Sequence, residues 1–258
     1  MTIGALVLAG RANTGALAAA ADVPLEALVP VAGRPMIGYV LDALRASSAV
    51  GPIVVVGDPA VLESEVGGGG VEFLAPGATL IDNLRIGFAA LASADRVLAV
   101  TSDIPLLTGE AIDDFIPRAE AAGGTFHYAI VERTVYEAAF PGSRRTWVRL
   151  RDGTFTGGNV FLADTSVAAG ALDLVDRFYA NRKNPLALAR LLGLGTIFAY
   201  LLRRLTVARL ERHVSGLVGS PGRALITPYA EIGFDVDRPD DLAAAEAWLR
   251  RRGQAGRA

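Results

Sequence analysis

Acidic side chains occur at two points where they could bind a divalent cation. Asp103 follows Arg96–Thr101, an apolar run with the composition of a buried strand. Asp235 lies in a second expected strand, Ile232–Val236, and Asp237 follows directly after it, so the two side chains should point the same way. Carboxylate oxygens are the usual protein ligands of Mg²⁺. We therefore predict a magnesium site formed by Asp103, Asp237 and Asp235; the alternative for Asp103 is to cap a turn.

A loop with two glycines follows the first apolar run, Ile3–Ala9, and could bind phosphate. Its small residues would let backbone N–H groups approach phosphate oxygens, and Arg11 would add a positive charge. The loop is neither a Walker loop nor a G-x-G-x-x-G fingerprint, so a simple tight turn is an equally good interpretation. The residues predicted here to contact a nucleotide are Leu8, Ala9, Gly10, Arg11, Asn13 and Gly15.

Strands and helices alternate through the first half of the chain. Apolar runs predict strands at Ile3–Ala9, Ile53–Gly57, Val71–Leu74 and Arg96–Thr101, and helices start at Pro35, Pro59, Thr79 and Thr108. Alternation with short connections is typical of a parallel, doubly wound α/β sheet. Ligands of such sheets bind beyond the carboxyl ends of the strands. Both the first loop and Asp103 lie at such ends.

The second half of the chain has a different pattern. Strands are expected at Phe126–Val131, Trp147–Leu150 and Phe155–Leu162, then helices at Ser166–Tyr179, Pro185–Leu202 and Val207–Val218, strands at Ala224–Thr227 and Ile232–Val236, and a helix from Pro239 to about Arg252. We predict one domain over residues 1–252 with a helical insertion near 166–218. Residues 253–258 should form a frayed tail.

Together these segments resemble the molybdenum-cofactor guanylyltransferase-like (MobA-like) NTP transferases, from Leu6 to about Leu249. The matching stretches are Leu8-Ala9-Gly10-Arg11, Pro30-Val31-Ala32-Gly33-Arg34-Pro35-Met36, Ser102-Asp103-Ile104-Pro105, Gly157-Gly158-Asn159 and Asp235 to Leu242. The resemblance implies a GT-A-type, Rossmann-like fold with three α/β/α layers around a mostly parallel mixed sheet. It also implies that Asp103 and Asp237 are the metal ligands.

The resemblance implies a Mg²⁺-dependent nucleotidyltransferase. Such an enzyme transfers a nucleoside monophosphate from an NTP to a phosphorylated small-molecule or lipid-linked acceptor and releases pyrophosphate. The resemblance assigns Asp103 to catalysis, Asn83 to the nucleotide, and Gly157, Gly158 and Asn159 to the acceptor. We also predict Arg11 and Arg34 as catalytic residues and Ser102 as a nucleotide contact. For Asn83, a solvated position at the start of a helix is an equally good interpretation.

One departure from the family pattern concerns the charge at the phosphates. The lysine that normally neutralises them falls, by spacing, at Glu26. A carboxylate there would repel a triphosphate, so Arg11 or Arg34 would have to take over. Glu26 favours one alternative, a nucleotide-binding regulatory domain without turnover. The other alternative, a GT-A-type glycosyltransferase, usually has Asp-x-Asp where this chain has Thr101-Ser102-Asp103.

Composition limits the partners. The chain has 258 residues, with 25 Lys and Arg against 27 Asp and Glu, so no basic surface for nucleic acid is expected. Cysteine is absent, which excludes disulfides and zinc–thiolate sites, and we expect a cytoplasmic protein. The apolar run within 185–204 is too short to span a bilayer. It is either a buried helix or an interfacial helix whose arginines contact a membrane surface or a lipid phosphate.

Overall fold

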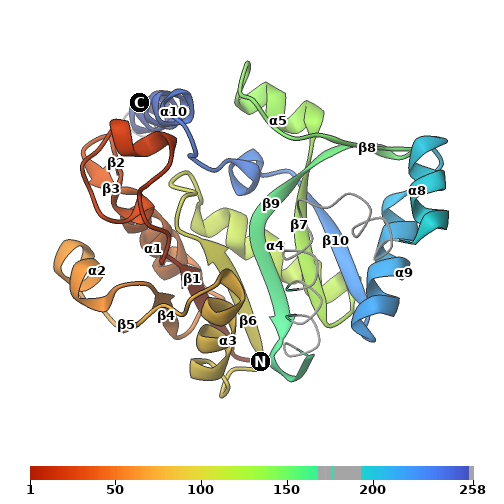
Figure 1. The fold of residues 1–258 in the computed structure, drawn as a ribbon, viewed down its shortest axis with the longest axis horizontal. Coiled ribbons are helices and arrows are strands. Elements are labelled where there is room, and N and C mark those ends of the chain that lie inside the picture. The colour runs from red at the N-terminus through yellow and green to blue at the C-terminus, as the bar shows by residue number, and fades with distance from the viewer. Residues whose placement is uncertain (168–171, 173–175, 177–192, 256–258) are drawn as a thin grey trace.

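The computed structural model describes residues 1–167, 172, 176 and 193–255. Its centre is an eight-stranded sheet in the order β10-β7-β9-β6-β1-β4-β5, with β8 paired to β9 (Figure 1). The strands are β1 Ile3–Leu8, β4 Ile53–Val56, β5 Val71–Leu74, β6 Arg96–Thr101, β7 Phe126–Glu132, β8 Val148–Leu150, β9 Gly153–Asp164 and β10 Gly222–Thr227. Strand β9 runs antiparallel to β6 and β7, and the other pairings along this order are parallel. The predicted α/β fold with a mostly parallel mixed sheet is confirmed.

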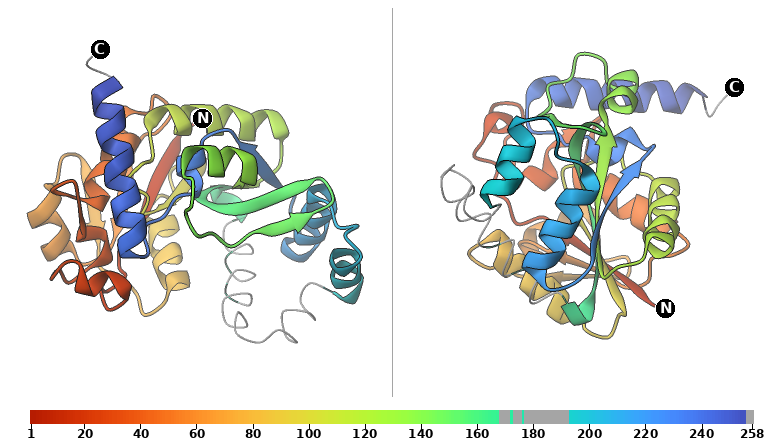
Figure 2. Two further views of the ribbon diagram at one scale, coloured as in Figure 1. Left: turned by 90° about the horizontal axis from the view of Figure 1, so that it is seen from above. Right: turned by 90° about the vertical axis from the view of Figure 1, so that its right-hand side faces the viewer.

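Helices cover both faces of this sheet (Figure 2). The described helices are α1 Met36–Ala46, α2 Pro59–Val66, α3 Leu80–Ala90, α4 Gly109–Ala122, α5 Arg133–Ala139, α8 Leu194–Leu201, α9 Val207–Val218 and α10 Pro239–Ala255. Helices α1 and α4 bury their apolar side chains against one face, and α3 and α9 lie on the other. A short hairpin of β2 (Pro30–Val31) and β3 (Arg34–Pro35) leads into α1.

The sequence explains these elements locally. In β1, Val7 packs toward α1 and α4 while Leu6 packs toward α3, so the strand is apolar on both sides and its sequence is a continuous apolar run. The predicted caps are present: the Thr79 side chain accepts from Asp82 N in a capping box, and Thr108 accepts from Ala111 N. Gly87 lets α3 approach β1, because a Cβ there would overlap the Leu6 side chain.

The segment before α10 differs from its prediction. Ile232–Val236 is not a strand: Ala230–Gly233 forms a 3-10 turn, η4, and the chain then continues to Asp237 without a ladder partner. Ile232, Phe234 and Val236 are nevertheless fully buried. Every second residue of this segment is therefore buried in the cores beneath α4, α5 and α10. This gives the sequence the two-residue hydrophobic period of a strand, although the segment belongs to no sheet.

The helical insertion is described only in part. Most of the predicted helix Ser166–Tyr179, and Pro185–Leu192 of the next one, lie outside the described residues. The described remainder of the latter is α8, and the predicted helix Val207–Val218 is confirmed as α9. The last helix continues to Ala255, three residues beyond its expected end, so the predicted tail begins later.

Candidate active site

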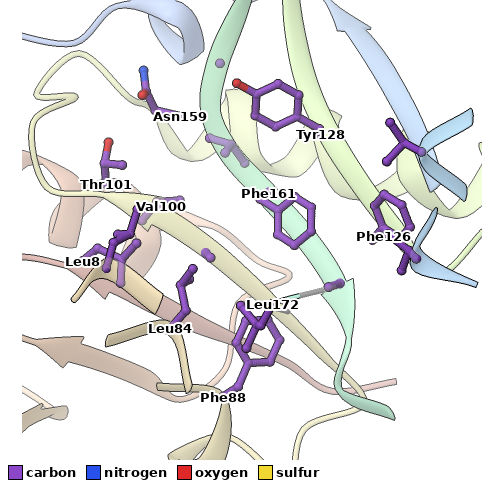
Figure 3. Close-up of a pocket in the computed structure, with 17 residues that line it drawn as sticks. Leu8, Leu84, Phe88, Val100, Thr101, Phe126, Tyr128, Asn159, Phe161 and Leu172 are labelled. Carbon is purple, nitrogen blue, oxygen red and sulfur yellow. The ribbon is translucent and has the colours of Figure 1, made fainter. Parts of the chain in front are cut away.

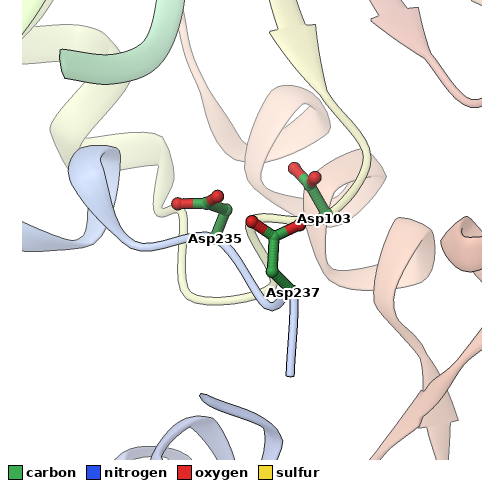
Figure 4. A group of neighbouring side chains, drawn as sticks. All are labelled: Asp103, Asp235 and Asp237. Carbon is green, nitrogen blue, oxygen red and sulfur yellow. The ribbon is translucent and has the colours of Figure 1, made fainter. Parts of the chain in front are cut away.

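Three carboxylates converge beyond the carboxyl ends of the central strands (Figure 4). Asp103 lies two residues after β6, and Asp235 and Asp237 lie on the segment between η4 and α10. One oxygen of each carboxylate lies within 4.8 Å of the others. The backbone N–H of Val236 donates to the Asp103 carbonyl at 2.9 Å, which fixes the two segments together. The structure thus brings together the three predicted metal ligands.

The carboxyl group of Asp103 has unusual electrostatics. Its pKa is raised from 3.8 to about 6, mainly by burial and also by the charges of Asp235 and Asp237, against the lowering effect of the Thr101 hydrogen bond. The Thr101 hydroxyl donates to Asp103 Oδ1 at 2.5 Å. Burial and Asp235 also raise the pKa of Asp237. A bound cation would offset the negative charge that these partly buried carboxylates bring together.

Arg145 is a site residue that sequence reasoning missed. Its guanidinium forms an ion pair with Asp235, donates to the Gly233 carbonyl, and lies 5.5 Å from the centroid of the Tyr136 ring. Both partners of the ion pair are largely buried, with side chains 14% and 17% exposed. Arg145 therefore fixes the orientation of Asp235. The sequence did contain one sign of a role for Arg145. Two adjacent arginines, Arg144 and Arg145, lie in a loop that has no acidic residue to pair with them.

Arg11 links the glycine-containing loop to the carboxylates. Its Nε lies 3.0 Å from Glu26 Oε2, and its Nη1 lies 3.4 Å from Asp237 Oδ1. The Glu26 side chain is only 7% exposed, and its backbone N–H donates to the Arg11 carbonyl at 3.0 Å. Burial raises the pKa of Glu26, and the charge of Arg11 lowers it. Glu26 is therefore next to the loop, with its charge paired to Arg11.

The other predicted nucleotide contacts lie around the same loop. A Cβ on Gly10 would be 3.0 Å from Pro76 Cβ and 3.2 Å from Asn83 Nδ2, so this position requires a close backbone approach. Asn83 Oδ1 accepts from Gly77 N at 2.7 Å, and Asn13 Nδ2 donates to the Ala21 carbonyl at 2.9 Å. The Asn13 amide holds the glycine-containing loop in shape, and the Asn83 amide holds the segment before α3 that lies beside it. Backbone hydrogen bonds fix the start of the loop: Ser102 N donates to the Leu8 carbonyl at 3.3 Å, and Ala9 N donates to the Val56 carbonyl at 2.9 Å. At the other end of the loop, a Cβ on Gly15 would lie 3.3 Å from Glu26 Oε1.

Arg34 does not join this group. Its Nη1 lies 2.6 Å from Asp42 Oδ2, its Nη2 donates to the Gly38 carbonyl at 2.9 Å, and its guanidinium lies 5.0 Å from the centroid of the Tyr39 ring. All three contacts are on α1. The Arg34 guanidinium therefore contacts only α1 among the residues that the structure describes, and of the two predicted arginines it is Arg11 that contacts the aspartate cluster.

The predicted acceptor segment, Gly157-Gly158-Asn159, lies in the middle of β9. A Cβ on Gly157 would lie 2.2 Å from the Tyr128 hydroxyl, and one on Gly158 would lie 2.9 Å from the Ala129 carbonyl oxygen. Packing against β7 thus requires both glycines. Asn159 Nδ2 donates to the Ile232 carbonyl at 3.4 Å and ties β9 to the segment that carries two of the aspartates.

A polar cavity of about 340 Å³ opens beside the carboxylates. It is lined by Arg144, Arg145, Thr146, Thr156, Asp235, Asp237, Arg238 and Asp241. Within the described part of the chain, the guanidiniums of Arg144 and Arg238 have no acidic partner. Two uncompensated cations next to a cluster of carboxylates form a suitable site for an anionic group.

Helix α8 exposes large apolar side chains. Phe198 and Leu201, with Leu202 directly after the helix, are 62%, 68% and 63% exposed, so the buried-helix interpretation is wrong at these positions, although Ala199 is buried. The guanidiniums of Arg203 and Arg204 adjoin them in the chain. Among the residues that the structure describes, no helix has the length and apolar character needed to cross a membrane.

A cluster of carboxylates facing a backbone loop suits reactions between phosphates, the chemistry of nucleotidyltransferases. Residues 5–159 match the model of the MobA-like NTP transferase domain, and the chain belongs to this family. It is 42% identical to a hypothetical transferase from Thermus thermophilus, with a TM-score of 0.82 over 94% of this chain and 100% of the other. The family resemblance drawn from the sequence motifs is therefore confirmed.

More distant relatives show the fold. A 4-diphosphocytidyl-2C-methyl-D-erythritol synthase from Anaerococcus prevotii has a TM-score of 0.59 at 12% identity, covering 97% of this chain and 96% of the other. A CMP:2-keto-3-deoxy-manno-octonic acid synthetase solved with CTP has a TM-score of 0.59 at 15% identity, covering 98% and 100%.

A curated relative is similar over a shorter stretch. The phosphoenolpyruvate guanylyltransferase of Sphaerobacter thermophilus is 36% identical over 84 residues, which are 31% of this chain. The match spans only 41% of that relative's length.

Proposed function

We propose that this protein transfers a nucleoside monophosphate from an NTP to a phosphorylated acceptor and releases pyrophosphate. The observation that carries the proposal is the convergence of Asp103, Asp235 and Asp237 beside the loop of an NTP transferase domain. An acceptor phosphate oxygen would attack the α-phosphorus, and the bond from the α-phosphorus to the bridging oxygen of pyrophosphate would break. The acceptor phosphate is already ionised near neutral pH, so no general base is required.

The three carboxylates fit Mg²⁺. Their oxygens are hard donors within 4.8 Å of one another. Asp235 and Asp237 are paired with arginines, whereas burial and these two neighbouring charges raise the pKa of Asp103. When bound, Mg²⁺ would neutralise charge on the reacting phosphates. Thr101 would orient Asp103, and Arg145 would orient Asp235. Positioning and charge compensation would carry most of the rate.

The two sides of the cluster suit the two substrates. The Gly10–Gly15 loop and Arg11 would hold the triphosphate, with Glu26 fixing the guanidinium beside Asp237. On the other side, Arg144 and Arg238 would hold the acceptor phosphate in the polar cavity. This arrangement would bring the acceptor oxygen and the α-phosphate together at the carboxylates.

Pyrophosphate release tests the proposal. Each of the four NTPs is incubated with and without Mg²⁺, and GTP with phosphoenolpyruvate is the first pair, because the Sphaerobacter relative is named for it. We expect Mg²⁺-dependent release that Asp237→Asn abolishes. Asp240→Asn is the matched control, because it makes the same change at an exposed residue outside the cluster.

Two results would contradict the proposal. Equal release by the Asp237→Asn variant would remove the carboxylate cluster from the reaction. Mg²⁺-dependent thermal stabilisation by an NTP, without pyrophosphate release for any acceptor tried, would favour the regulatory alternative.

A further inference from the structure

Two apolar cavities lie under α9 on one face of the sheet. The first has a volume of about 490 Å³ and is bounded by α3, β6, β9 and α9 (Figure 3). The second, of about 400 Å³, lies between α9 and β7, β8, β9 and β10. Phe126, Tyr128 and Val214 line both. We call the two cavities together the apolar trough.

Both parts of the trough reach the candidate active site. Thr101 lines the first cavity and donates its hydroxyl hydrogen to Asp103. Thr156 lines the second cavity and also the polar cavity that contains Asp235 and Asp237. Figure 3 shows Thr101 and Asn159 at one end of the first cavity and Phe88 at the other. The trough therefore has a polar end at the carboxylates and a hydrocarbon interior.

Water is a poor occupant of such a trough. Volumes of several hundred cubic ångströms with apolar walls and a few polar groups at one end are typical of small-molecule sites. Water in the interior would find few hydrogen-bonding partners, because residues such as Leu84, Phe88 and Phe161 line it. A hydrocarbon chain would make favourable contacts along the whole length.

We propose that the apolar trough binds the hydrocarbon tail of the acceptor, which makes the acceptor a lipid phosphate. This assignment rests on the proposed function, which supplies the phosphate at the carboxylates. The headgroup phosphate lies between Arg144, Arg238 and the aspartates, and the tail extends under α9.

The exposed face of α8 supports this assignment independently. Arg209 on α9 donates to the Gly195 carbonyl at 3.0 Å, so α8 and α9 are in contact. One helix, α9, thus contributes Val214 and Val218 to the trough and also contacts the helix that exposes Phe198 and Leu201. An apolar face followed by Arg203 and Arg204 has the chemistry of an anionic bilayer contact. A lipid phosphate would be taken up from such a surface.

The experiment compares two phosphate monoesters that differ only in the tail. Binding of n-dodecyl phosphate and n-propyl phosphate to the intact protein is measured calorimetrically, below the micelle concentration and without NTP. Each buried methylene strengthens binding about fourfold, so four buried methylenes would favour the dodecyl ester by roughly a hundredfold or more. Equal affinities would overturn the assignment.

A pair of variants locates the tail. Leu84 on α3 lines the first cavity, so Leu84→Trp should fill part of it and weaken dodecyl phosphate binding at least about tenfold, without weakening propyl phosphate. Ala89→Trp adds the same side chain to an exposed position of the same helix and should change neither. Equal dodecyl phosphate affinities for the two variants would overturn the assignment to the trough. Circular dichroism and Mg²⁺-dependent NTP binding verify that each variant folds.

The proposed function is tested separately with the same two esters. Pyrophosphate release that depends on dodecyl phosphate supports both proposals. Tail-dependent binding without release for any NTP would overturn the transferase function and leave the trough assignment standing. Pyrophosphate release with propyl phosphate, together with equal affinities for the two esters, would support the transferase function and overturn the trough assignment.

Discussion

Replacing Asp103 by asparagine should stabilise the metal-free protein. Asparagine keeps the shape of the side chain and can still accept the hydrogen bond from Thr101 at Oδ1. It removes one of three neighbouring negative charges and leaves Asp235 paired with Arg145. The difference in the free energy of unfolding between the variant and the wild type therefore measures how much the charge of Asp103 destabilises the folded protein.

The pKa of Asp103 sets the size of this effect. A rise from 3.8 to about 6 corresponds to a preference of about 3 kcal/mol for the neutral carboxyl in the fold, and this is the upper bound on the gain at pH 7. The folded state binds the proton more tightly than the unfolded state does. The contribution of Asp103 to stability is therefore largest below pH 3.8 and is lost as the pH rises through about 6. The advantage of the variant should accordingly disappear near pH 4.

Thermal unfolding in EDTA measures the effect. At pH 7, Asp103→Asn should raise Tm by roughly 5–10 °C, and Asp240→Asn, an exposed control, should not raise it. Adding Mg²⁺ should stabilise the wild type more than the variant, because the carboxylate is a proposed ligand. A variant less stable than the wild type in EDTA at pH 7, or a difference independent of pH, would refute the reasoning.

Four further predictions follow from the site and from α8. Glu26→Gln should weaken NTP binding several-fold in calorimetry, since Arg11 loses its ionic partner; unchanged affinity would mean that Arg11 does not need it. Glu26→Lys, which charge alone predicts to tighten NTP binding by about 1 kcal/mol, should lower Tm instead, because the lysine would be buried beside Arg11. Arg144→Ala should raise KM for the acceptor about tenfold and leave KM for the NTP unchanged; a change in both would place Arg144 elsewhere in the mechanism. The protein should sediment with anionic vesicles at low salt and less at high salt, and Leu201→Asp should reduce this; no retention at low salt would exclude the membrane contact.

The sequence predicted the sheet and the three carboxylates well, for identifiable reasons. The strands β1, β4 and β6 are buried on both faces, so each is a continuous apolar run ending near a polar loop. Thr79 and Thr108 fix the starts of α3 and α4 through local hydrogen bonds. Features with such local causes are visible in a single sequence.

Features that depend on distant partners were not visible. The alternation of Ile232, Phe234 and Val236 indicated a strand, but no neighbouring strand is available there. Glu26 was expected to repel a triphosphate, and its pairing with Arg11 depends on a contact between two loops. Arg145 had no local carboxylate, because its partner Asp235 lies far along the chain. Sequence spacing does not encode these contacts.

The position of the three aspartates in the sequence also determines when, during synthesis, the candidate active site can form. The matched family domain ends at residue 159 and contains Asp103, whereas Asp235 and Asp237 come from beyond it. Arg11 contacts Asp237 across 226 positions, and Ala32 N donates to Glu246 on α10 at 3.1 Å. Synthesis starts at the N-terminus, and contacts at such separation form late because a long loop must close first. A growing chain would thus have the glycine loop well before the three carboxylates could come together, and a segment synthesised long after Asp103 would complete the cluster.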